Sequence, residues 1–154
     1  MLPVGLALAY LYAQRKPEPF HFYKEPMHGH DVWRLPIIEP HELITADCFA
    51  ACQGWTYQTA GSGPTNFSSD SINYQASRIC FHSEASQSYG FLNIKTNKLT
   101  QSLTRDQFAD SLQLFGNSSR LFQTTSVYQC WRETGQLPWA NEILATQQCG
   151  LLKN

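Results

Sequence analysis

The stretch INYQASRICFHSEASQSYGFLNIKTNKLTQSLTRDQFADSLQLFG, residues 72–116, decides the fold class. Its first half is rich in aromatic and β-branched residues in partial alternation with polar ones, which favours strands over 72–81 and 89–94 joined by a Ser-rich turn. A turn at Asn97-Lys98 then leads into a further extended segment. We therefore expect this stretch to begin as an antiparallel meander.

A helix follows the meander, and a capping box marks its start. The Thr104 side chain can accept a hydrogen bond from the backbone of Gln107, and the Gln107 side chain can reach back to the backbone of Thr104. Leu103 and Phe108 flank this pair and can pack on each other as a hydrophobic staple. The helix is therefore predicted to begin at Arg105.

Two further helices are predicted after the first one. Gly116 and Gly135 each offer the left-handed conformation that commonly ends a helix, and the second helix is expected over 125–134. A short third helix is expected over 140–147. Because the strands come first and the helices later, we predict an α+β fold, an antiparallel sheet with two or three C-terminal helices packed on one face.

The chain of 154 residues is expected to form a single domain behind two N-terminal segments. Residues 1–16 read as an apolar anchor or the remnant of a signal, and residues 17–31 as an extended tether. Three prolines exclude a helix from this tether, and its aromatic side chains are expected on the surface of the domain. The domain itself is predicted to span residues 32–154.

The first part of the domain is less regular. Residues 32–38, VWRLPII, predict an edge strand or an extended crossing segment, because Pro36 interrupts a β-favouring run. Residues 41–53 fit either a short helix or an extension of that strand. Residues 59–71 are small and polar, which is typical of a mobile surface loop.

The segment from Leu2 to Ala13 is apolar and uncharged. As a helix it would span about 18 Å, less than the hydrocarbon core of about 30 Å. It reads as a membrane or signal segment whose first residues lie upstream, as a weak anchor, or as an element packed on the domain. Arg15 and Lys16 favour a cytoplasmic side for the chain that follows, whereas the cysteine content favours an oxidising compartment. We expect an extracytoplasmic, periplasmic location with membrane association through Leu2 to Ala13.

The charge and the cysteines limit the function classes. The chain has 12 acidic and 11 basic residues, and the basic residues are scattered, so the sequence offers no basic stripe for nucleic acid. Five cysteines are many for a cytosolic chain of this length, and they fit either disulfides or small buried apolar residues, with the connectivity left open. These cysteines are Cys48, Cys52, Cys80, Cys130 and Cys149.

Two residue groups could carry enzyme chemistry. His28, His30 and Asp31 could present two imidazoles and a carboxylate to a metal ion in a turn, although solvent-exposed tether histidines are the simpler interpretation. Cys80 and His82 could form a thiolate and imidazole pair on one face of a strand, although core packing explains them more economically. The sequence has no phosphate-binding glycine motif, so no cofactor is expected.

Tryptophan suggests a surface for a protein partner. Most of the four tryptophans are expected in the core, but Trp139 follows a helix stop and is expected to be partly exposed. The loop around Gly61, Ser62 and Gly63 is the second candidate contact surface. Sequence reasoning thus assigns these residues to partner binding and assigns none to catalysis.

The chain also resembles a class of known proteins. Residues 33–43, WRLPIIEPHEL, with 89–94 and 135–139, resemble small bacterial proteins associated with immunity to secreted toxins. The resemblance implies a non-enzymatic inhibitor that docks on a cognate toxin, and it carries over no functional residue. The alternatives are a small metal-dependent or cysteine hydrolase, and an accessory subunit of a membrane assembly.

Overall fold

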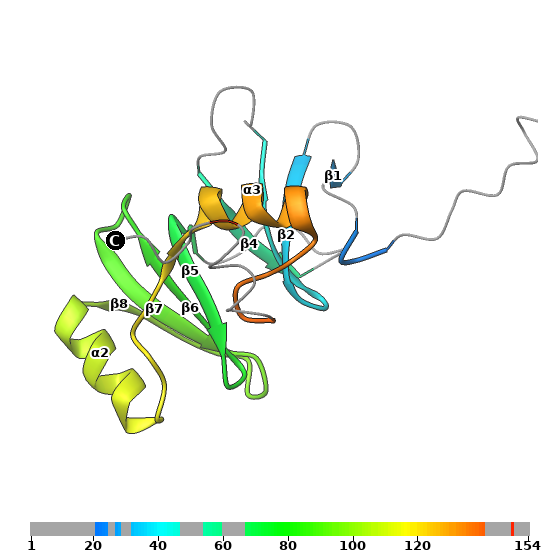
Figure 1. The fold of residues 1–154 in the computed structure, drawn as a ribbon. Coiled ribbons are helices and arrows are strands. Elements are labelled where there is room, and N and C mark those ends of the chain that lie inside the picture. The colour runs from blue at the N-terminus through cyan, green and yellow to red at the C-terminus, as the bar shows by residue number, and fades with distance from the viewer. Residues whose placement is uncertain are drawn as a thin grey trace, which may run out of the picture.

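The computed structural model describes residues 21–24, 27–28, 32–46, 54–59, 67–140 and 149, with only the backbone described at 27–28. It confirms the α+β class: antiparallel strands come first, and helices follow (Figure 1). The strands form two sheets, where the sequence led us to expect one. The position of the core therefore depends on which residues face the space between the two sheets.

The first sheet has the strand order β1-β2-β3-β4, and every neighbouring pair is antiparallel. Its strands are β1 (Met27–His28), β2 (Val32–Ile38), β3 (His41–Thr45) and β4 (Thr56–Thr59). Of the two alternatives predicted for residues 41–53, residues 41–45 form a strand. Residues 47–53 lie outside the described residues. The β2–β3 register shifts between Pro36 and Ile38, where the proline has no N–H for the ladder.

The prediction that β2 is an edge strand was wrong over its first two residues, because β1 pairs with them there.

The second sheet has the order β8-β7-β6-β5-β9. Its strands are β5 (Ser71–Gln75), β6 (Arg78–Ser83), β7 (Ser88–Asn93), β8 (Lys98–Leu103) and β9 (Phe122–Gln123). The single strand predicted over 72–81 was wrong, because β5 and β6 form a hairpin. Ala76 and Ser77 have φ values of 44° and 61°, and two successive positive φ angles are typical of a tight type I′ hairpin turn.

The loop predicted over 59–71 was wrong at its C-terminal end. Phe67 is buried, and its ring stacks on Phe81 with centroids 3.8 Å apart. Its carbonyl accepts a hydrogen bond from Tyr57 N, and Ser69 N donates to the carbonyl of Trp55. Phe67, a single aromatic residue in a polar stretch, therefore packs the C-terminal end of this segment into the core. Residues 60–66 lie outside the described residues.

The main core fills the space between the two sheets. β2, β3 and β4 contribute one side, β5, β6 and β7 the other, and helix α3 (Thr124–Thr134) covers it. Representative members are Leu35, Leu43, Trp55, Ile72, Ile79, Leu92 and Tyr128. Figure 1 shows α3 in front of β2, and the rings of Trp33 in β2 and Tyr128 in α3 are in contact, with centroids 6.2 Å apart.

A second, smaller cluster lies on the other face of the five-stranded sheet. Helix α2 (Arg105–Leu114) packs Phe108 and Leu112 against Cys80 and Phe91. Along β6, Ile79 belongs to the main core whereas Cys80 belongs to this cluster, because alternate strand residues point to opposite faces. The two helices therefore use opposite faces of this sheet, although they were predicted on one face.

A buried ion pair lies on the side of the four-stranded sheet away from the main core. Arg34 Nε donates to Glu42 Oε2 over 2.7 Å, and Gln58 Nε2 donates to Glu42 Oε1 over 2.7 Å. Arg34 also donates to the carbonyl of Phe22, whose ring lies 4.6 Å from the guanidinium carbon. The prediction that Phe22 lies on the surface was wrong, because its carbonyl and its ring both contact Arg34 and the residue is buried. The neighbouring Tyr23 is exposed, as the sequence predicted.

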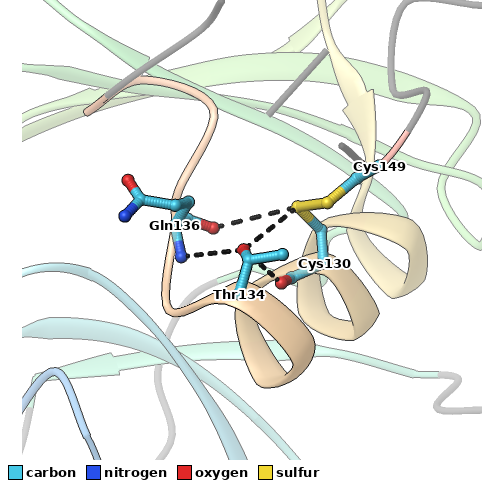
Figure 2. The surroundings of a disulfide bond; sticks show 4 residues. All are labelled: Cys130, Thr134, Gln136 and Cys149. Atoms are coloured by element: carbon cyan, nitrogen blue, oxygen red, sulfur yellow. Dashed lines mark hydrogen bonds between the residues drawn. A yellow bond between two sulfur atoms is a disulfide. The ribbon is translucent and has the colours of Figure 1, made fainter. Parts of the chain in front are cut away.

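One disulfide confirms part of the cysteine prediction. Cys130 in α3 is bonded to Cys149, 19 residues later in the chain (Figure 2). Thr134 supports it, because its hydroxyl donates to the carbonyl of Cys130 over 2.7 Å and lies 3.8 Å from the Cys130 sulfur. Cys80 has a free thiol and is buried, which fits the apolar alternative. Cys48 and Cys52 lie outside the described residues.

The remaining predictions concern the two ends of the chain. The third helix was predicted over 140–147, and residues 141–147 lie outside the described residues, as do Leu2 to Ala13. Among the described helices, none has the length and apolar character needed to cross a membrane.

Candidate functional site

Trp139 lies beyond the end of α3 and is half-buried, as predicted. Its indole Nε1 donates to the carbonyl oxygen of Ile37 in β2 over 3.0 Å. The chain on either side is also fixed, because Leu137 is buried and its carbonyl accepts a hydrogen bond from Ala140 N. The Trp139 ring is thus held against the domain and remains partly exposed.

A cavity of about 280 Å³ opens beside this ring. We call it the aromatic cavity, and its residues come from β5, β9, the turn after α3 and the segment before β9. Its lining includes Tyr74, Gln75, Arg120, Phe122, Pro138 and Trp139. The cavity combines aromatic rings with one guanidinium group, and segments far apart in the sequence meet there.

The segment 118–121 is held at the edge of β5 by side-chain amides. β9 pairs with only the first two residues of β5. Farther along, Asn73 Nδ2 donates to the carbonyl of Arg120 over 3.1 Å, and Ser118 N donates to Gln75 Oε1 over 3.0 Å. Gln75 Nε2 also donates to the carbonyl of Ser118. These bonds replace a strand ladder and fix the backbone on which Arg120 is carried.

A second, larger hollow lies next to the same segment and has a volume of about 520 Å³. We call it the basic groove. Its lining includes Ser71, His82, Tyr89, Arg105, Ser119 and Arg120. The groove shares Ser118 and Arg120 with the aromatic cavity, so the segment 118–121 borders both hollows.

The strand register forms the floor of the basic groove. Ser71 on β5 is opposite His82 on β6, and His82 is opposite Tyr89 on β7. Cross-strand partners point to the same face of a sheet, so these three side chains form one row. The His82 and Tyr89 rings are in contact, with centroids 4.3 Å apart, and Phe108 of α2 lies 5.2 Å from Tyr89.

The lining of the basic groove is strongly biased in charge. Arg105 is the first residue of α2, and Arg120 lies in the segment that leads to β9. Among the lining residues that the structure describes, none is an aspartate or a glutamate. The positive end of the α2 dipole lies beside Arg105 and has the same sign, and Asp106 in the first turn of α2 offsets part of this potential. The groove can therefore attract an anionic group.

Cys80 and His82, the predicted thiolate and imidazole pair, lie in different environments. Both side chains are on the same face of β6, but Cys80 is fully buried beneath α2, whereas His82 lies at the basic groove. Burial raises the pKa of the Cys80 thiol to about 12, although Gln75 and the charge of Arg78 act in the opposite direction. The thiol is thus protonated at neutral pH, and a thiolate is the form that a cysteine nucleophile needs.

The other predicted site residues are not described. Gly61, Ser62 and Gly63 lie outside the described residues, as do His30, Asp31 and the side chain of His28. Among the side chains that are described, no group of three or more metal-binding residues gathers at one point.

Sequence reasoning missed the basic groove altogether. Arg105 was recognised only as the start of a helix, and Arg120 belongs to no motif. A usable signal was the lack of acidic residues between Asp110 and Glu133, a stretch that includes Arg120. Comparison of the chain with protein-family models, curated proteins and solved structures finds no match.

Proposed function

We propose that this chain is a non-enzymatic protein-binding domain, of the immunity type that inhibits a cognate secreted toxin. The observation that carries the proposal is the half-buried Trp139, fixed through its indole N–H beside the aromatic cavity. Tryptophan, tyrosine and arginine dominate the residues on which protein complexes depend most, and all three are present here. A ring held in place before binding loses little conformational entropy when a partner covers it.

The proposal includes a periplasmic location with membrane association through Leu2 to Ala13. The disulfide between Cys130 and Cys149 supports the location, because disulfides persist in oxidising compartments. The contact surface is the aromatic cavity and the chain around it, and the loop at Gly61, Ser62 and Gly63 remains a second candidate contact.

The proposal is tested by capturing and then purifying the partner. The full chain is cross-linked in cells that produce it, the linked protein is identified by mass spectrometry, and its affinity for the purified chain is measured by calorimetry. We expect Trp139→Ala to weaken that affinity by at least tenfold, because truncating a central aromatic anchor typically costs about 2 kcal/mol or more. An immunity role also requires the chain to neutralise the toxicity of the partner.

The control is Leu114→Ala, which removes an apolar side chain that is 86% exposed at the end of α2 and outside the cavity lining. Both variants are checked by circular dichroism. Equal affinity of the wild type and Trp139→Ala would reject the aromatic cavity as the contact surface. Recovery of membrane subunits that are lost when residues 1–16 are deleted would instead support the accessory-subunit alternative.

A further inference from the structure

The basic groove differs in charge from the molecule as a whole. The chain has a formal net charge of −1, yet the described lining of the groove contains two arginines, one histidine and no carboxylate. Arginine presents a planar fork of donors that matches the two oxygens of a carboxylate. A ligand that complements this surface is therefore anionic.

Both arginines are carried on backbone that is already fixed. Arg105 follows the capping box in which Thr104 and Gln107 bond each other's backbone. The backbone of Arg120 is bonded on both sides: its N–H donates to Ser118 Oγ over 3.1 Å, and its carbonyl accepts from Asn73. Binding a ligand therefore requires the ordering of side chains and no ordering of a loop, which limits the entropic cost.

The floor and the size of the groove argue for a ligand larger than a single ion. The lining of the groove also contains three residues with hydroxyl groups, Ser71, Tyr89 and Ser119. Hydroxyl groups can donate to carboxylate or carbonyl oxygens and can accept from backbone N–H groups. The volume of about 520 Å³ lies within the usual range for sites that hold ligands of several groups.

The position of the groove connects it to the aromatic cavity. The segment 118–121 borders both, and Arg120 lines both. A protein seated on Trp139 therefore reaches the basic groove by passing over the segment 118–121, which borders both hollows.

We infer that the basic groove binds an acidic segment of the protein partner, with aspartate or glutamate carboxylates seated on Arg105 and Arg120. The inference rests on the proposed function, because it assigns a chemistry to the partner of that same surface.

The first test uses a fluorescently labelled hexaglutamate peptide and the full chain, with fluorescence anisotropy as the readout. We expect binding that weakens as the salt concentration rises, because exposed charges are screened. The double variant Arg105→Gln and Arg120→Gln should weaken binding by at least tenfold. The matched control, Lys95→Gln with Lys98→Gln, removes two exposed charges from the β7–β8 turn and should retain wild-type affinity.

Three results would overturn the inference. The arginine variant could bind the peptide as well as the wild type, or the lysine control could lose as much affinity, which would indicate an effect of overall charge. Inorganic phosphate could displace the peptide at equal concentration, which would indicate a site for a small anion. Circular dichroism and thermal unfolding of both variants exclude a loss of folding as the cause.

A second test uses the partner identified through Trp139. If Trp139→Ala weakens partner binding and the arginine variant does not, the proposed function stands and the acidic-segment inference fails. If the arginine variant weakens the affinity by at least tenfold and reduces its salt dependence, the inference is confirmed on the natural partner. If no partner is found, the proposed function fails, and the peptide result still decides the chemistry of the groove.

Discussion

His41 is a residue whose environment could not be read from its neighbours in the chain. It lies at the first position of β3, and its Nδ1 is 2.6 Å from the hydroxyl of Tyr57. Tyr57 stacks on Phe67, and Phe67 stacks on Phe81, so the four rings form a stack that extends from one sheet to the other. Partial burial lowers the pKa of His41 below its ordinary value, because burial disfavours the charged imidazolium.

This lowered pKa predicts that the protein loses stability at mildly acidic pH. As the pH falls below about 6.5, the unfolded chain takes up a proton on His41 while the folded chain does not, so the free energy of unfolding decreases. The decrease ends once the pH is below the pKa of His41 in the folded state. We expect His41→Asn to reduce the difference in unfolding free energy between pH 7.5 and pH 5, measured by urea denaturation.

Tyr57→Phe tests whether burial is the cause of the lowered pKa of His41. It removes the hydroxyl but leaves a ring over His41, and because burial is the cause of the shift, the pH dependence should remain. If His41→Asn shows the same decrease between the two pH values as the wild type, His41 is not the group responsible.

At the scale of an element, α2 shows how a local signal fixes a helix on a sheet. Thr104 and Gln107 form the predicted capping box, with Thr104 N bonded to Gln107 Oε1 over 2.9 Å. Gly116 has a φ of 70°, which confirms its role just after the helix. Leu103 packs against the cluster that includes Phe108, as a hydrophobic staple requires.

Thr104→Ala should therefore lower the free energy of unfolding by about 1 kcal/mol, because it leaves an N-terminal backbone donor of α2 without its side-chain acceptor. Urea denaturation at neutral pH measures the change. Gln113→Ala, at an exposed position of the same helix, is the matched control and should change stability little, since alanine is the best helix former. Equal effects of the two substitutions would show that the capping box contributes no stability of its own.

At the scale of the whole molecule, the C-terminal part of the chain closes the fold against the N-terminal part. Trp131 Nε1 donates to the carbonyl of Tyr23 over 3.3 Å, and Trp139 Nε1 donates to that of Ile37. Each bond joins residues more than 100 positions apart. The disulfide from Cys130 continues this closure to residue 149. The surface proposed to bind a partner thus depends on both ends of the domain.

Loss of the disulfide should destabilise the protein substantially. For a closed loop of this length, 19 residues in sequence separation, the chain-entropy model gives about 3 kcal/mol. Cys149→Ser should therefore lower the free energy of unfolding by about that amount, measured by guanidinium denaturation under non-reducing conditions. Peptide mapping without reduction checks the pairing, and a link from Cys149 to a cysteine other than Cys130 would contradict the structure.

Local patterns account for the parts of the fold that sequence reasoning predicted correctly. The α2 capping box, the glycine ends of both helices and the strand over 89–93 depend on residues a few positions apart. The hairpin turn within residues 72–81 was missed for a local reason too. Neither Ala76 nor Ser77 is a residue type that commonly adopts a positive φ. The placement of Phe67 could not be predicted, since its partners Tyr57 and Phe81 lie on different sheets.

By itself the sequence determined the α+β class, the limits of α2 and α3, and the partial exposure of Trp139 after a helix stop. Only the tertiary structure decided that two sheets enclose the core, that Cys80 is buried while His82 is accessible, and that Arg105 and Arg120 line one groove. The physical reason is the range of the interactions. Caps and helix stops act within one or two turns of the chain, whereas the groove depends on strand register and helix docking between distant segments.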